Sequence, residues 1–108
     1  MQKDALLELI TLLMKKENTN DQELPVQIGE KYFIRTVTHY VVGKLEDIKG
    51  NFLVFSNASW IPDTGIFSNF LKSGEANEVE PVKGLYRVAV GSIVDIFDWN
   101  HSLFDKQK

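Results

Sequence analysis

The sequence contains no cysteine, so it can form neither a disulfide framework nor a zinc site with thiolate ligands. It also lacks a long apolar run, since none approaches the roughly 20 residues that a membrane-spanning helix requires. The apolar stretch Leu6–Met14 carries Glu8, and no small-residue cleavage site follows it, so it is a poor signal peptide. We therefore expect a cytoplasmic protein with no membrane partner.

Basic charge and catalytic motifs are equally scarce. Lys and Arg number 12 against 15 Asp and Glu, and the formal charge of −3 gives no general attraction to nucleic acid or anionic lipid. No G-x-S-x-G, GxGxxG or Walker sequence occurs. The candidate metal ligands match no metal motif in their spacing; they are His39, Asp63, Asp95, Asp98 and His101. We expect no enzymatic activity, no cofactor and no metal.

The residues that are present suit one globular domain. The 108 residues are 44% apolar and 25% charged, which are ordinary values for a folded protein. We expect a helix over residues 4–16 and a polar connector over 17–25. A β-barrel-like body then covers 30–100, with an inserted helical segment over 64–73.

The predicted N-terminal helix has a wide apolar surface. Asp4 is suited to cap it. Its apolar residues cover an arc of roughly 220°, about twice what one packing surface needs. Either the helix is buried between its own sheet and the C-terminal tail, or one of its faces contacts a second copy. In the second case the interface residues are Leu6, Leu7, Ile10, Leu13 and Met14.

The body is rich in β-branched and aromatic residues, which predict strands. A Lys-Gly-Asn turn at 49–51 predicts a hairpin between Tyr40–Ile48 and Phe52–Ala58. Gly43 and Gly91 mark strong bends. These features predict a mainly β protein with helices (α+β). Its N-terminal helix precedes a small, strongly bent, five-stranded antiparallel sheet or barrel with a short inserted helix.

The segment after the hairpin carries helix signals. We expect Pro62 to end the strand, Asp63 or Thr64 to cap a short helix, and Gly74 to follow the helix C-terminus. The acidic stretch 75–84 then predicts a loop before two further strands.

Aromatic residues around this turn allow two interpretations. In the first, the turn closes one end of the barrel as core, through Trp60, Ile66, Phe67, Phe70 and Leu71. In the second, Trp60, Asp63, Thr64 and Phe67 form a binding lip, since Trp and Phe on loops are favoured interface anchors.

Basic and tyrosine residues offer a further hypothesis. A nucleic-acid surface would form if the first and fourth strands were neighbours, with tyrosines that stack bases. Its residues would be Lys31, Arg35, Lys44, Arg87, Tyr32, Tyr40 and Tyr86. Acidic residues are spread through the same strands, so a solvated face of mixed charge is the stronger expectation.

Two stretches of the body share their apolar spacing with a known family. Gly43-Lys44-Leu45, a turn with Asn51, and Leu53-Val54-Phe55 resemble the first Sm motif of the Sm/LSm/Hfq family, and the segment from Tyr86 to Ile96 resembles the second. The leading helix is also in the family's order. The resemblance implies a small barrel and self-assembly. The hairpin is shorter than the family's and Val90 stands where the family has the Arg of an Arg-Gly pair, so the family's RNA-contacting residues do not carry over.

These observations favour a non-catalytic binding or assembly module that forms a homo-oligomer, with room for a protein partner. One alternative is an Sm-like nucleic-acid-binding protein. Another is a small-ligand pocket or enzyme around Trp60, Asp63 and His39. In general character the chain resembles the small proteins of bacterial and phage genomes.

Overall fold

The computed structural model describes residues 24–108. In chain order they form β1 (Lys31–Thr36), β2 (Tyr40–Lys49), β3 (Phe52–Asp63), α2 (Phe67–Ser73), β4 (Glu78–Pro81), β5 (Tyr86–Ala89), the 3-10 helix η1 (Val90–Ser92) and β6 (Ile93–Asp98). The predicted N-terminal helix over 4–16, its five interface residues and the connector up to residue 23 lie outside the described residues. Those predictions stay predictions.

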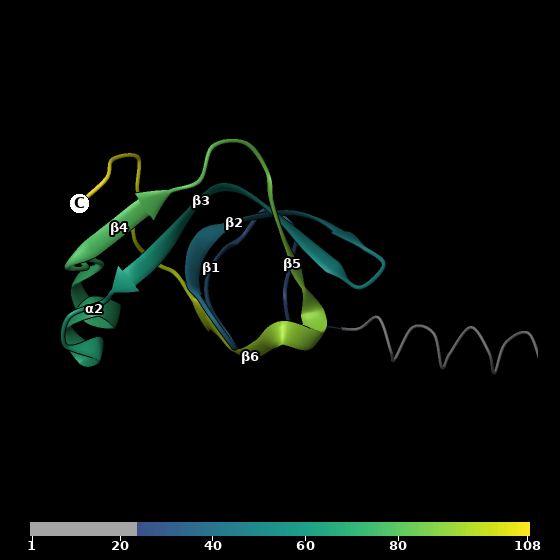
Figure 1. The fold of residues 1–108 in the computed structure, drawn as a ribbon. Coiled ribbons are helices and arrows are strands. Elements are labelled where there is room, and N and C mark those ends of the chain that lie inside the picture. The colour runs from purple at the N-terminus through teal and green to yellow at the C-terminus, as the bar shows by residue number, and fades with distance from the viewer. Residues whose placement is uncertain (1–23) are drawn as a thin grey trace, which may run out of the picture.

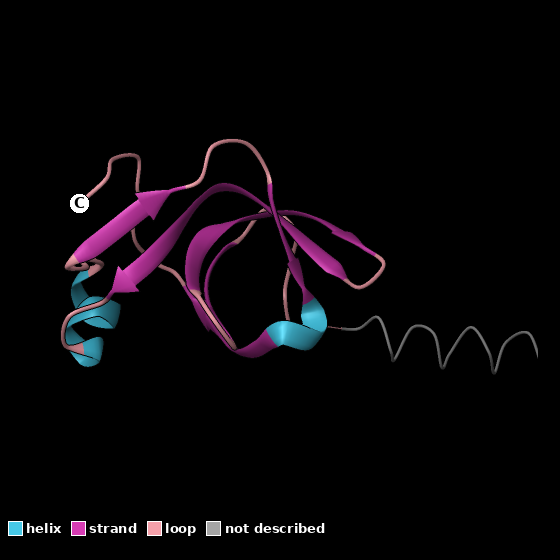
Figure 2. Ribbon diagram, viewed as in Figure 1, coloured by secondary structure: helices cyan, strands magenta, loops and turns pink. Residues whose placement is uncertain are grey.

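The strands form one antiparallel sheet that curls around its own interior (Figure 1). The order along the sheet is β4-β3-β2-β1-β6, and β5 pairs with the first part of β3 while β4 pairs with its last part. The prediction of a small, strongly bent antiparallel sheet is confirmed, with six strands rather than five. The inserted helix lies between β3 and β4 (Figure 2).

The predicted hairpin is formed by β2 and β3. Lys49 pairs with Phe52, and Gly50 supplies the left-handed backbone (φ 56°) that a tight turn needs. The register of the pair shifts at Gly43, where an added Cβ would lie 3.2 Å from the Cβ of Phe55. The absence of a side chain therefore lets the two strands approach and bend, as the sequence predicts for this glycine.

Pro62 does not end the strand, contrary to the prediction, and β3 continues to Asp63. Pairing with β2 stops at Trp60, so the missing N–H of the proline removes no hydrogen bond on that side. On the β4 side the register shifts between Trp60 and Asp63, and such irregularities accommodate proline.

The acidic stretch 75–84 is not a simple loop, again contrary to the prediction. Glu78–Pro81 forms β4, in which Val79 is fully buried while Glu78 and Glu80 are exposed. A four-residue strand with one buried position has too little alternation to be recognised in the sequence.

The short inserted helix is confirmed over Phe67–Ser73. Gly74 ends it in the left-handed conformation (φ 76°), and its N–H donates to the carbonyl of Phe70 at 2.8 Å. This is the C-terminal glycine arrangement that the sequence predicts.

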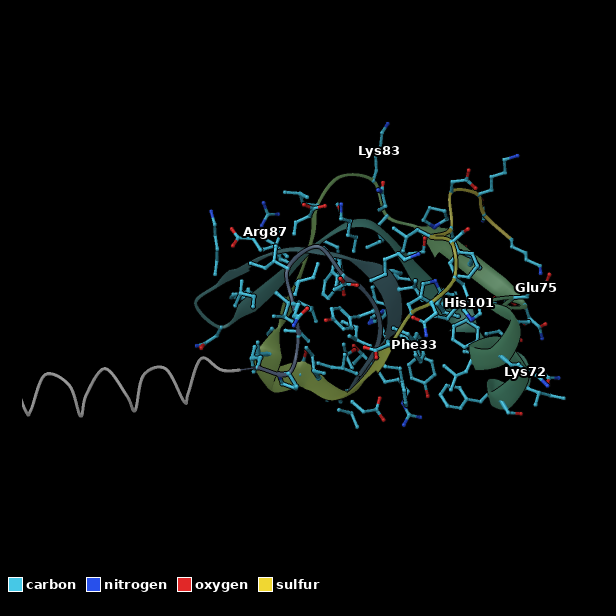
Figure 3. All side chains as sticks on the ribbon, turned by 180° about the vertical axis from the view of Figure 1, so that it is seen from behind. Phe33, Lys72, Glu75, Lys83, Arg87 and His101 are labelled. Carbon is cyan, nitrogen blue, oxygen red and sulfur yellow. The ribbon has the colours of Figure 1, made fainter. Side chains whose placement is uncertain are left out.

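Two hydrophobic cores share the strands β1 and β2, because alternate residues of these strands are buried on opposite faces. The barrel core lies inside the curled sheet and consists of Tyr32, Ile34, Val41, Leu45, Leu53, Phe55, Ala58 and Val88. The aromatic core consists of Phe33, Val42, Ile61, Phe70, Ala76, Val79 and Trp99. Phe33 lies between the strands and α2 (Figure 3). Leu103 and Phe104 of the C-terminal tail pack against the aromatic core.

Candidate functional site

An open pocket lies where the β1–β2 turn faces the last part of β3. Its volume is about 630 Å³. Aromatic and apolar groups, hydroxyls and one imidazole line it, and in the described part of the chain no Lys, Arg, Asp or Glu does. The lining residues of this pocket, called the Trp60 pocket below, are Thr36, Val37, Thr38, His39, Tyr40, Trp60, Ile61 and Pro62. A concave surface that combines aromatic rings with polar groups suits an organic ligand.

The β1–β2 turn fixes one wall of the pocket through the hydroxyl of Thr36. This hydroxyl donates to the carbonyl of His39 and accepts the N–H of His39, each at 2.8 Å. The backbone N–H of Thr36 donates to the same carbonyl at 2.8 Å. These bonds fix the backbone of the turn at His39.

His39 and Trp60 form the aromatic centre of the pocket. Their ring centroids are 4.5 Å apart, with 34° between the ring planes. The Trp60 ring also meets the edge of Tyr86 at 6.4 Å, which links the pocket to β5. Trp60 is 37% exposed although it lies in a strand. The sequence names Trp60 and His39 as candidates, and the structure brings them together.

Asp63 and Thr64 do not line the pocket, and they do not cap α2 as predicted. The N-cap is Ile66, with no side-chain hydrogen bond. Asp63 Oδ1 accepts the N–H of Gly65 at 2.8 Å, and the hydroxyl of Thr64 donates to the carbonyl of Gly65 at 2.9 Å. These two side chains shape the turn between β3 and α2.

The remaining aromatic and apolar candidates of this segment divide between core and surface. Phe70 is fully buried, and Phe67 and Leu71 pack half-buried against the aromatic core. Ile66 is 69% exposed. The interpretation that all of these residues close the barrel as core is therefore wrong for Ile66 and for Trp60.

An ion pair joins β1 to β6. Arg35 Nε donates to the two carboxylate oxygens of Asp95 at 2.7 and 3.0 Å, and its NH2 group also bonds Asp95. The hydrogen bonds from Arg35 lower the pKa of Asp95 below its ordinary value of 3.8. The guanidinium also lies over the rings of Phe67 and Phe97, at 5.2 and 5.5 Å. The ion pair therefore ties β6 to β1, and its guanidinium packs against a side chain of α2.

The residues considered as metal ligands are dispersed. His39 lines the Trp60 pocket, whereas the His101 ring nitrogen Nε2 is 2.8 Å from the carbonyl of Leu71 in the last turn of α2. Between residues 24 and 108, no three His, Asp or Glu side chains lie close enough to hold a metal ion.

Three of the four predicted basic residues have partners. Arg35 is in the ion pair above, Lys44 Nζ lies 3.8 Å from a carboxylate oxygen of Glu46, and Lys31 Nζ donates to a backbone carbonyl at 2.5 Å. Arg87 is exposed. Because each of these three residues has a different partner, the contacts do not bring the basic residues together into one surface.

The sequence did not single out the two strand edges that the topology exposes. β5 and β6 are joined only by η1, at the bend predicted for Gly91, yet β5 pairs with β3 and β6 pairs with β1. Among residues 24–108, no strand pairs with the outer edge of either one. Apolar side chains lie exposed at these edges, with Leu85 51% and Val94 66% exposed.

Between residues 24 and 108, no helix is long and apolar enough to cross a bilayer.

No protein-family model matches the chain, and no curated protein matches it. Among solved structures, the chain is similar to a heptameric archaeal Sm protein, with 18% sequence identity and a TM-score of 0.46. The similarity covers 66% of this chain and 87% of that one. The fold thus has a weak resemblance to an Sm protein.

Proposed function

We propose that this chain is a non-catalytic assembly module whose copies join edge to edge, with β5 of one copy against β6 of the next. Two strand edges that have no partner among residues 24–108 carry this proposal. An open edge presents a row of N–H and C=O groups that pair readily with another strand. Strand addition of this kind is a common mode of association.

The two edges differ, and that difference determines the kind of assembly. A contact between unlike surfaces is heterologous, so it generates a ring if the rotation closes and a filament if it does not. Each copy contributes one β5 edge and one β6 edge.

The side chains at the two edges are complementary. Val94 on β6 and Leu85 before β5 are exposed apolar groups that would leave water on association. Arg87 on β5 and Lys83 before it project outward (Figure 3), whereas β6 ends on the exposed Asp98. Opposite charges at the two edges favour β5–β6 pairing over pairing of two like edges.

Light scattering on the full chain tests the proposal. We expect a mass that is a multiple of 12.3 kDa at micromolar concentration. Val94→Glu should reduce this mass to one chain without unfolding the protein, since Val94 is 66% exposed. Ile66→Glu is the matched control, because Ile66 is 69% exposed but lies directly before α2, away from β5 and β6.

A wild-type chain that stays monomeric at high micromolar concentration would contradict self-association. A Val94→Glu protein that keeps the full mass would contradict the strand-edge interface. If Ile10→Glu combined with Met14→Glu then dissociated it, the interface would be the apolar N-terminal helix instead.

Nucleic-acid binding, the Sm-like alternative, has its own test. The net charge of −3 and the partners of the basic residues support our prediction of no affinity tighter than the non-specific range of roughly 10⁻⁴–10⁻⁶ M. Tyr32 is 5% exposed, so it is not available to stack on a base. A sub-micromolar complex with short single-stranded RNA, weakening steeply with salt, would favour the alternative.

A further inference from the structure

We propose that the Trp60 pocket binds an arginine side chain presented by a peptide segment of a partner protein. The pocket places the partly exposed indole of Trp60 beside the imidazole of His39, and no Lys or Arg among residues 24–108 lines it. A cation over an indole face is attracted by the negative charge of the ring surface, and indole is the best side chain for this contact.

Carboxylates lie beside Trp60 on the β4 side. Trp60 pairs directly with Glu80 across the β3–β4 ladder, so the two side chains lie on one face of the sheet. Glu78 lies two residues from Glu80 on that same face, and it pairs directly with Asp63. An acidic row therefore adjoins the aromatic surface.

These carboxylates have only neutral donors. Asp63 accepts from Gly65 N–H at 2.8 Å, and Glu80 accepts from the side-chain amide of Gln107 at 3.2 Å. In the part of the chain that the structure describes, neither forms an ion pair with Lys or Arg. Like charges directly opposite each other in an antiparallel pair are destabilising. The isolated domain thus retains an unfavourable arrangement that a bound cation would relieve.

Arginine fits this combination better than other ligands. Its planar guanidinium stacks on an aromatic ring and still directs N–H donors at a carboxylate in the same plane. A phosphate-bearing ligand such as an oligonucleotide would meet Glu80 and Asp63 with the same sign of charge. A neutral apolar ligand would gain nothing from the acidic row.

A titration of the full chain with a capped peptide that contains one arginine tests the proposal. The control peptide has citrulline at that position, which keeps the shape and removes the charge. Trp60 reports binding by its fluorescence, because Trp99 is 2% exposed and does not contact solvent. We expect the citrulline peptide to bind about 3- to 30-fold more weakly, as loss of a cation–π contact implies.

Variants then locate the site by calorimetry. Trp60→Leu should abolish measurable binding, and Glu80→Gln should weaken it a few-fold. Glu75→Gln is the matched control, since Glu75 is an exposed carboxylate after α2 (Figure 3) and does not line the Trp60 pocket. Equal binding of the two peptides, or unchanged binding by the Trp60→Leu protein, would overturn the proposal. Tighter binding of a short oligothymidylate than of the arginine peptide would also overturn it, in favour of a nucleic-acid ligand.

Discussion

The two ends of the sheet are finished in different ways. At the β4 end, the N–H and carbonyl of Val79 both bond to Lys108, at 3.0 Å each, so the chain's own tail covers part of that edge. By contrast, two strands have no partner at their outer edges among residues 24–108: β6 at the other end of the sheet, and β5, which pairs with the first part of β3 on the same side as β4.

The side chains at the two ends follow the same division. Beside β4, the residue Val79 is fully buried in the aromatic core together with Phe70 and Trp99. On β6, Val94 is 66% exposed, and an ion pair from Asp95 ties the strand to β1. The comparison teaches that the β4 edge is partly covered by the chain's own tail, whereas the β5 and β6 edges present surfaces suited to a second copy.

The largest expected loss of stability comes from a substitution in the aromatic core, at the β4 end of the sheet. Phe70→Ala should destabilise the protein by about 3–5 kcal/mol, because it opens a cavity in a fully packed aromatic cluster. Phe52→Ala is the matched control at 47% exposure and should cost far less. Urea denaturation measures both, and similar losses for the two variants would show that the aromatic core is not the main support of this end.

Gly74→Ala should have the next largest effect. A Cβ at Gly74 would lie 2.5 Å from Cγ of His101, and the backbone is left-handed there (φ 76°). Backbone strain of this kind costs on the order of 1–3 kcal/mol before any clash. Gly84→Ala separates the two causes, since Gly84 has φ 82° but no atom within 4 Å of the added Cβ. Equal losses of stability in the two variants would mean that the contact with His101 adds nothing to the cost of the backbone strain.

The ion pair between Arg35 and Asp95 predicts that the stability of the protein depends on pH. Because the pKa of Asp95 in the folded protein lies below 3.8, its contribution is present above that value and is lost as the pH falls through the folded pKa. Asp95→Asn should therefore lower the melting temperature at pH 7, and the difference from wild type should vanish in strong acid. A difference that persists at low pH would show that packing, not charge, holds β6.

A smaller effect is expected from the charges at the open edges, because exposed ion pairs contribute about 0.2–1 kcal/mol each. Arg87→Glu alone and Asp98→Lys alone should each weaken assembly. A mixture of the two variants should restore it, since every contact then joins opposite charges. Light scattering measures all three samples, and a mixture no better than its components would place these residues outside the interface.

Local signals in the sequence predict part of this architecture well. The Lys-Gly-Asn turn predicts the β2–β3 hairpin because a left-handed glycine permits few other structures, and Gly74 predicts the end of α2 for the same reason. Pro62 leads to a wrong prediction, because a proline ends a strand only where a neighbouring strand needs its missing N–H, and the sequence does not show which neighbour lies there. β4 is missed because its stability comes from the buried Val79 and not from its own pattern.

The candidate site shows the same limit. An exposed tryptophan beside a turn is recognisable in sequence, and His39 is one of only two histidines. Their contact depends on the β1–β2 turn folding onto β3, a pairing 21 residues apart that no local signal encodes. The open edges of β5 and β6 are likewise a property of strand order, which apolar spacing alone does not define.

Amide hydrogen exchange as a function of protein concentration tests the edge-to-edge assembly most directly. We expect the outward-facing amides of β5 and β6 to exchange more slowly as the concentration rises into the range where light scattering shows a multimer. Amides of β4 should not change, because their partner belongs to the same chain. Exchange at β5 and β6 that is independent of concentration in an assembled protein would contradict strand addition as the mode of association.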